Sequence, residues 1–230
     1  TLFSPFAGNN YFEENTKVGN LIDSAIIFKA DNQIAFNAND NTPDQKSCSM
    51  LRDKFGKFDL SMLNYNAAGP YPSCFDNLSE EEKIEEHHNN LERNISYLHE
   101  NLKILESKYY LPFAGAYVIG GNRSFKNKYL GTTTWDDCAK KLKKLPNLST
   151  KVICLREQDK FDLDTGEADK EYIPIDTIEV NKYIESKLSI LEYPYEKLEF
   201  PDEKQLKVDL LNSIDALEIR NKRIGIIPDM

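Results

Sequence analysis

The stretch DSAIIFKADNQIAFNANDNTPD, residues 23–44, decides the fold that we expect for this chain. Residues 24–28 and 33–37 are rich in Ile, Phe and Ala, and Ala30-Asp31-Asn32 separates them, a pattern that predicts a β-hairpin. The second arm ends in the polar run Asn37-Ala38-Asn39-Asp40-Asn41. Because α/β folds bind ligands at the carboxyl ends of strands, we expect this run to be a loop with a functional role.

Alternating helix and strand patterns follow the hairpin. The expected elements are a helix over 44–55, a strand over 58–63, a helix over 79–107, a strand over 109–113, a helix over 135–145, a strand over 151–155, an acidic hairpin or loop over 159–175, and helices over 177–191 and 203–220. Ser79 and Glu82 form a capping box, and Ile84 and Leu91 begin an apolar stripe along the long helix. This order predicts an α/β fold with helices layered on a sheet.

Composition excludes several classes of protein. The chain has 230 residues, of which 40% are hydrophobic, so it can bury a sizeable core. Its net charge of −9 argues against a nucleic-acid partner, since phosphate neutralisation needs a basic surface. No apolar run approaches the roughly 18 residues of a membrane span, and no secretion signal is evident. We therefore expect a cytoplasmic protein.

The basic cluster Lys140, Lys141, Lys143 and Lys144 stands against this acidic background. Its commoner interpretation is a solvated helix face. The alternative is a local anchor for an anionic ligand such as a nucleotide phosphate.

Histidine and cysteine offer no familiar metal motif. His87, His88 and His99 lie on the predicted long helix, and we expect them on its solvated or boundary face. The four cysteines are far apart and include no Cys-x-x-Cys pair, which is typical of a reduced protein without a zinc knuckle.

Asp40 is the best candidate metal ligand. A carboxylate at the end of a strand has its orientation fixed by the sheet, which suits a divalent cation. The alternative, which the residues alone favour, is an Asx cap of the turn that follows.

A further set of landmarks occurs in a distinctive order. The hairpin that ends in Asn39-Asp40 is followed by a strand, by the small-residue loop 67–72, by the long helix, and by Tyr110-Leu-Pro-Phe-Ala-Gly-Ala-Tyr117. From Asp23 to Tyr117 this series resembles the second half of the metallo-β-lactamase fold. It is most similar to the sandwich domain of the CMP-N-acetylneuraminate hydroxylase-like proteins. In hydrolytic members a metal-binding His commonly stands where this chain has Ala114-Gly115.

The resemblance implies the C-terminal half of an αββα sandwich. Residues 1–155 would form the half-domain, and residues 156–230 an acidic loop with a helical C-terminal extension. The chain does not begin with Met and ends in a strand-like run at 223–230, so we expect a fragment of a larger protein.

The resemblance also assigns a site. Asp40 would hold a divalent metal, zinc or iron, with ligands absent from this chain, because the family's histidine cluster belongs to the first half of the fold. Asn64, Tyr65 and Tyr117 would line the substrate mouth.

Two functions follow as expectations. The first is a metal-dependent enzyme, a hydrolase or a two-iron oxygenase, that acts on a sugar or nucleotide-sugar. The alternative is a metal-free binding or assembly module that retains the fold.

Overall fold

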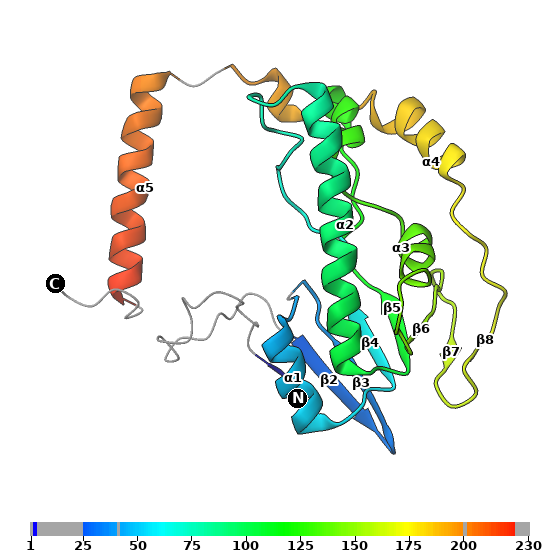
Figure 1. The fold of residues 1–230 in the computed structure, drawn as a ribbon. Coiled ribbons are helices and arrows are strands. Elements are labelled where there is room, and N and C mark those ends of the chain that lie inside the picture. The colour runs from blue at the N-terminus through cyan, green and yellow to red at the C-terminus, as the bar shows by residue number, and fades with distance from the viewer. Residues whose placement is uncertain (1, 4–24, 41, 200–201, 224–230) are drawn as a thin grey trace. The chain divides into compact units, whose positions relative to one another are not determined.

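The computed structural model describes residues 2–3, 25–40, 42–199 and 202–223 (Figure 1). The chain divides into two compact units, Thr1–Leu191 and Glu192–Met230. The predicted division after residue 155 marks where the family resemblance would end. It is not a division into compact units, and it stays a prediction. The strand-like run expected at the C-terminus lies outside the described residues.

A mixed sheet forms the centre of the first unit. Its spatial order is the chain order: β1 (Leu2–Phe3), β2 (Ala25–Ala30), β3 (Gln33–Asn37), β4 (Leu60–Leu63), β5 (Tyr109–Pro112) and β6 (Lys151–Val152). The predicted hairpin is confirmed, since β2 and β3 pair antiparallel from Ile26↔Asn37 to Ala30↔Gln33. The strands from β3 to β6 are parallel to one another. The predicted α/β class is therefore confirmed.

The remaining elements connect and follow these strands. In the first unit they are α1 (Gln45–Phe55), α2 (Glu80–Leu105), the 3₁₀ segment η1 (Gly121–Tyr129), α3 (Trp135–Leu142), the hairpin of β7 (Phe161–Asp162) and β8 (Glu167–Ala168), α4 (Thr177–Tyr183) and the π-helical turn η2 (Ile184–Leu188). The second unit contains the 3₁₀ turn η3 (Pro194–Lys197) and α5 (Glu203–Arg223). Among the described residues, no helix combines the length and apolarity that a membrane span requires.

The long helix α2 begins at the predicted capping box. The Ser79 hydroxyl accepts from the Glu82 backbone N–H at 3.2 Å, and the Glu82 carboxylate accepts from the Ser79 N–H at 2.7 Å. This pair satisfies two N–H groups that the first turn would otherwise leave without partners. The predicted apolar stripe is buried at its members Leu91, Ile95, Leu98, Leu102 and Leu105. Ile84, expected in the same stripe, is instead exposed.

The core lies on one face of the sheet. Along the strands every second side chain packs into the core formed with α1, α2 and α3; these residues are Ala25, Ile27, Phe36, Ala38, Leu63, Tyr110 and Val152. Right-handed crossovers between parallel strands that are added in one direction place their connections on one side, which explains this arrangement. Several of the alternate side chains, such as Leu60, Met62 and Leu111, are only half-buried, although Tyr109 on that face is buried beneath Phe161. The two faces of the sheet are therefore unequally covered.

The β7–β8 hairpin contacts the starts of β3, β5 and β6, the last through the Lys151 ammonium group, which donates to the Gly166 carbonyl at 3.4 Å. The Phe161 ring packs edge-on against Tyr109 with the ring centroids 4.9 Å apart. The ammonium group of Lys108 donates to the Leu163 carbonyl at 3.0 Å, and the Gln33 amide donates to Asp164 at 2.5 Å. Residues 161–168 therefore belong to the same compact unit as the strands.

Candidate functional site

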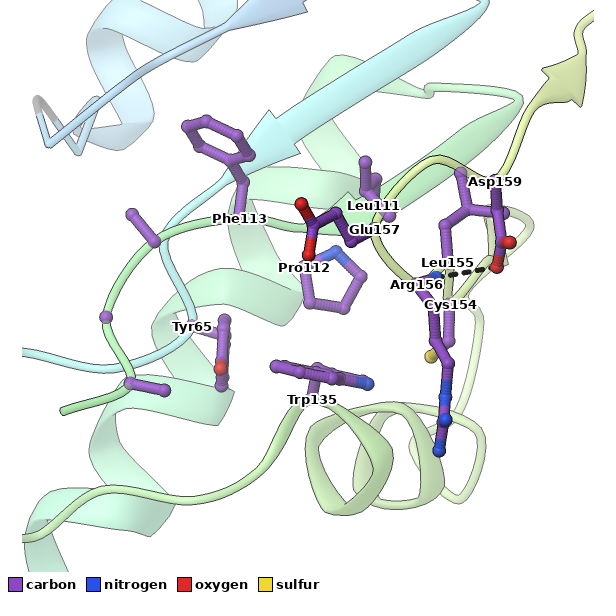
Figure 2. A pocket seen from close by; sticks show the side chains of 13 residues that line it. Tyr65, Leu111, Pro112, Phe113, Trp135, Cys154, Leu155, Arg156, Glu157 and Asp159 are labelled. Atoms are coloured by element: carbon purple, nitrogen blue, oxygen red, sulfur yellow. Dashed lines mark hydrogen bonds between the residues drawn. The ribbon is translucent and has the colours of Figure 1, made fainter. Parts of the chain in front are cut away.

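A cavity of about 490 Å³ opens at the carboxyl edge of the parallel strands (Figure 2). Tyr65 follows β4 by two residues, Phe113 follows β5 directly, and Cys154 follows β6 by two residues. Because parallel strands end at the same edge, these three loops meet there. The residues that line the cavity are Tyr65, Leu111, Pro112, Phe113, Ala114, Gly115, Ala116, Trp135, Cys154, Leu155, Arg156, Glu157 and Asp159.

Asn66 joins the β4 loop to the segment that leads into α3. Its side-chain amide donates to the Thr133 carbonyl at 2.8 Å, and its side-chain oxygen accepts from the Thr133 N–H at 2.9 Å. The next residue, Thr134, is the N-cap of α3, and its hydroxyl accepts from the Asp137 N–H at 3.1 Å. Trp135 is the first residue of α3. The paired hydrogen bonds of Asn66 thus fix where the indole enters the cavity wall.

Gly115 completes this junction from the β5 loop. Its φ of +107° lies in a region that side chains other than hydrogen disfavour. A Cβ atom there would lie 3.0 Å from the Asn66 Cβ and 3.2 Å from the Asn66 carbonyl oxygen. Glycine therefore allows the β5 loop to lie directly against the β4 loop.

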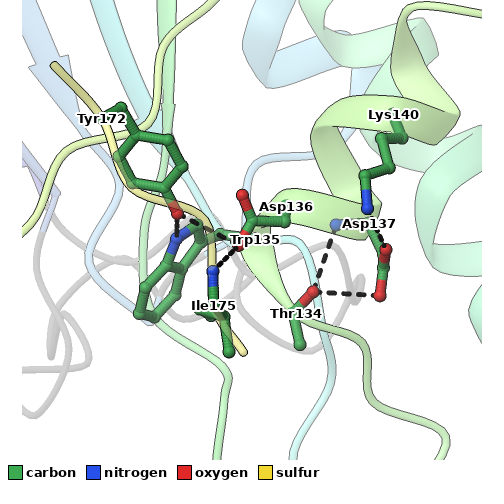
Figure 3. A network of polar contacts seen from close by, with 7 residues as sticks. All are labelled: Thr134, Trp135, Asp136, Asp137, Lys140, Tyr172 and Ile175. Carbon is green, nitrogen blue, oxygen red and sulfur yellow. Dashed lines mark hydrogen bonds and ion pairs between the residues drawn. The ribbon is translucent and has the colours of Figure 1, made fainter. Parts of the chain in front are cut away.

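A second network holds residues 172–175 against α3 (Figure 3). The Trp135 indole N–H donates to the Tyr172 hydroxyl, which donates to the Asp136 carboxylate at 3.1 Å. The same carboxylate oxygen accepts from the Ile175 backbone N–H at 2.9 Å. The orientation of the indole is therefore set by hydrogen bonds as well as by packing.

Arg156, in the loop after β6, binds the same segment through two hydrogen bonds. Its Nε donates to the Ile173 carbonyl at 2.8 Å and its Nη2 to the Pro174 carbonyl at 3.2 Å. Asp159 accepts from the Arg156 backbone N–H at 2.8 Å and pairs with Lys170 at 3.2 Å. The hydrogen bond from the Arg156 backbone, followed by the Lys170 ammonium, lowers the pKa of Asp159, which is therefore ionised at neutral pH.

Burial keeps the inner wall of the cavity uncharged. Desolvation is the main cause that raises the pKa of Tyr65 to about 12 and that of Cys154 to about 11. At neutral pH the Tyr65 hydroxyl is a hydrogen-bond donor, and Cys154 is a thiol rather than the nucleophilic thiolate. The ionic groups of the lining, Arg156, Glu157 and Asp159, belong to the segment that begins at Cys154 (Figure 2). Such a wall of aromatic rings and neutral donors with an ionic segment beside it suits the binding of a polar small molecule.

The four predicted site residues are not brought together. Tyr65 lines the cavity, whereas Asp40, Asn64 and Tyr117 are not among its lining residues. The Tyr117 hydroxyl instead donates to the Gly69 carbonyl at 3.3 Å. Asn64 is half-buried, and its side-chain oxygen is buried without a hydrogen-bond partner in the described part of the chain.

Asp40 lies exposed in the turn after β3. The structure shows no hydrogen bond or ion pair between Asp40 and another described residue. Neighbouring residues cap the turn and the helix α1 that follows it. The Asn37 side chain accepts from the Asn39 N–H, and the Asp44 side chain accepts from the Ser47 N–H as the N-cap of α1. No group of three or more His, Cys, Asp or Glu side chains that could hold a metal occurs among residues 2–3, 25–40, 42–199 and 202–223. A transition-metal site needs about three protein ligands, so the described residues alone do not fit one.

Sequence reasoning missed Trp135, Arg156, Glu157 and Asn66. A signal for three of them was present, since Asn66, Arg156 and Glu157 follow predicted strands by a few residues. Trp135 gave no such signal, because it comes from the start of a helix that is brought to the strand ends by Asn66.

Two of the three histidines are less exposed than predicted. His99 is buried, and its ring Nε2 contacts the Pro146 carbonyl oxygen at 3.0 Å. His87 is half-buried, and its Nδ1 accepts from the Gly131 N–H at 2.8 Å. The solvated face predicted for His87 and the exposed or boundary position predicted for His99 were wrong, because η1 and the segments around α3 pack against α2. His88 is exposed, as expected.

The His87 contact predicts a pH dependence of stability. Burial, followed by the neighbouring His88, lowers the pKa of His87 in the folded protein. The unfolded chain, with an ordinary pKa of about 6.5, then binds a proton more readily than the folded chain. We expect the free energy of unfolding to fall as the pH drops below about 6.5 and to level off below the folded pKa.

Urea unfolding at a series of pH values measures this effect. His87→Asn keeps an oxygen near the position of Nδ1 and cannot be protonated, so its pH dependence between about 5 and 6.5 should be weaker than that of the natural chain. His88→Asn, the neighbouring exposed control, should keep most of the slope. Equal slopes for the natural chain and His87→Asn would contradict the assignment.

Comparison with models of protein families, with curated proteins and with solved structures found no significant match to this chain.

Proposed function

We propose that the cavity binds a sugar or nucleotide-sugar, with the apolar face of the sugar against Trp135, beside the buried Tyr65. The observation that carries this proposal is the composition of the cavity, in which the aromatic residues Tyr65, Phe113 and Trp135 share the lining with Glu157 and Arg156. A pyranose presents C–H groups on its faces and hydroxyls at its edge. Aromatic rings suit the faces, and carboxylate oxygens accept hydrogen bonds from the hydroxyls.

The single tryptophan of the chain provides the test. Because Trp135 lines the cavity, a ligand there should change its fluorescence. Titration with neutral hexoses, an N-acetylated amino sugar and nucleotide-sugars should give a saturable change for at least one of them. Calorimetry should return the same dissociation constant.

Variants locate the binding. Glu157→Gln should weaken binding about tenfold, which corresponds to the loss of a charge-assisted hydrogen bond of about 1.4 kcal/mol. Glu185→Gln, an exposed carboxylate outside the cavity lining, should leave the dissociation constant unchanged. Absence of binding by every sugar tested, in both measurements, would contradict the proposal.

We further propose that residues 1–155, within the first unit, are the C-terminal half of a metallo-β-lactamase-type sandwich. The unequal cover of the sheet supports this, because helices pack on one face while several side chains of the other, such as Leu60, Met62 and Leu111, are only half-buried. An αββα sandwich has this asymmetry in each half, with helices outside and a second sheet inside. The proposal needs a second sheet supplied from outside the described residues.

A metal-dependent hydrolase or oxygenase is the second candidate function. One observation favours it: Asp40 is an exposed carboxylate after β3, at the same carboxyl edge of the sheet as the cavity. Zinc or iron would there need further ligands from outside the described residues. Metal analysis of the full-length natural protein tests this, since Asp40→Ala should lower the metal content and Asp53→Ala, an exposed control in α1, should not. Unchanged metal content in Asp40→Ala would exclude this role for Asp40.

A further inference from the structure

A second cavity, of about 280 Å³, lies next to the first. Cys154 lines both, and Trp135 and Asp136, which are adjacent in the chain, line one each. Pro174, whose carbonyl accepts from Arg156, lines the second cavity, whereas Arg156 itself lines the first. The two cavities therefore share a wall at Cys154, and a ligand that occupied both would have to pass this residue.

Two ammonium groups belong to this second cavity. Lys140 and Lys143 are three residues apart at the end of α3, a spacing that places both on one face of a helix. Lys140 pairs with Asp137 at 3.1 Å, but the lysine side chain is largely exposed and the aspartate side chain is 44% exposed, so water weakens the pair. The structure shows no carboxylate within ion-pair distance of Lys143 among the described residues. Its charge also opposes the larger effect of burial on the pKa of Cys154, which places Lys143 close to that wall.

Asp136, the acidic residue that lines this cavity, already has hydrogen-bond donors. Asp136 accepts from the Tyr172 hydroxyl and from the Ile175 N–H, so its charge is partly balanced by two donors. Arg156 stands at the boundary with two of its N–H groups used on carbonyl oxygens. A guanidinium has five N–H donors, so further donors remain for an anion. The cavity thus combines a positive charge balance with neighbouring hydrogen-bond donors.

We infer that this second cavity is an oxyanion subsite, in which Lys140 and Lys143 bind a phosphate group of the ligand. The inference rests on the proposed function, because the sugar that carries the phosphate would occupy the first cavity. The inference narrows the expected ligands from sugars in general to sugar phosphates and nucleotide-sugars. The alternative for these lysines is a solvated helix face with no ligand.

Three probes test the subsite by calorimetry: a hexose, the corresponding hexose phosphate and inorganic phosphate. We expect the hexose phosphate to bind at least tenfold more tightly than the hexose. Lys143→Glu should abolish that difference, while Lys144→Glu, the adjacent lysine that does not line the cavity, should change it less than twofold. Lys143→Glu should leave the affinity for the neutral hexose unchanged. Circular dichroism should show that both variants remain folded.

The outcomes separate the subsite from the proposed function. A hexose that binds equally with and without its phosphate would overturn the subsite and leave the sugar site standing. If no hexose binds but inorganic phosphate binds and is lost in Lys143→Glu alone, the subsite stands and the sugar site fails. If Lys143→Glu and Lys144→Glu lose the same affinity for the hexose phosphate, the effect comes from the overall positive charge of the basic cluster. That result would also overturn the subsite.

Discussion

Asn66→Ala should lower the free energy of unfolding by about 2–4 kcal/mol. The change removes two hydrogen bonds to Thr133 and leaves its backbone N–H and carbonyl without these partners. A net hydrogen bond contributes about 1 kcal/mol, and a buried group left unsatisfied costs about 1–3 kcal/mol. Urea unfolding followed by circular dichroism measures the loss. The fluorescence of Trp135 should also shift to longer wavelength, because the segment that leads into α3 loses its attachment.

Asn64→Ala is the matched control, two residues earlier in the same loop. Its side-chain oxygen is buried without a hydrogen-bond partner in the described part of the chain. Removal of that amide should therefore cost less than about 1 kcal/mol, or even stabilise the fold, since the penalty of an unsatisfied group disappears. Equal losses for the two variants would show that the bonds between Asn66 and Thr133 do not hold the junction together.

Gly115→Ala should also destabilise the protein by about 2–4 kcal/mol. Strain from a side chain at a φ of +107° costs about 1–3 kcal/mol, and overpacking against the Asn66 backbone adds about 1 kcal/mol, the low end of its usual range. The new methyl would also displace the β5 loop, so sugar binding should weaken. Urea unfolding gives the first effect, and titration of Trp135 fluorescence gives the second.

Gly69→Ala separates crowding from the loss of a glycine. A Cβ atom at residue 69 would meet nothing within 4 Å, and its φ is not in the strained positive region. Its effect should stay within about 1 kcal/mol and is expected to be stabilising, through the reduced entropy of the unfolded chain. A destabilisation of Gly69→Ala as large as that of Gly115→Ala would contradict the close contact between the β4 and β5 loops.

Local patterns predicted most of the fold. The alternation of Ile26 to Asn37 and the Ser79 capping box depend on residues that are close in the chain, and both agree with the structure. The prediction that Ile84 belongs to the buried stripe was wrong for a physical reason. At 26 residues, α2 is about 39 Å long, whereas the four-residue strand β4 spans about 13 Å. The amino-terminal end of the helix therefore extends beyond the sheet, and the apolar stripe has no sheet to cover there.

The candidate site was predicted less well. Tyr65 was found because it follows a strand, which is a local signal. Trp135 reaches the same cavity through the contact of Asn66 with Thr133, which are 67 residues apart in the chain. No periodicity or spacing reports such a contact between side chain and backbone. The role of Asp40 as a metal ligand stays a prediction, as does the resemblance from which it was drawn.

The spatial order of the strands has a consequence for synthesis on the ribosome. From β2 to β6 each strand pairs with the one made immediately before it. A growing chain can therefore extend its sheet one strand at a time, and no early strand must wait beside an open gap for a partner made later. The last strand to be added is also among the shortest, at two residues, so the finished edge offers few unpaired backbone groups to other nascent chains.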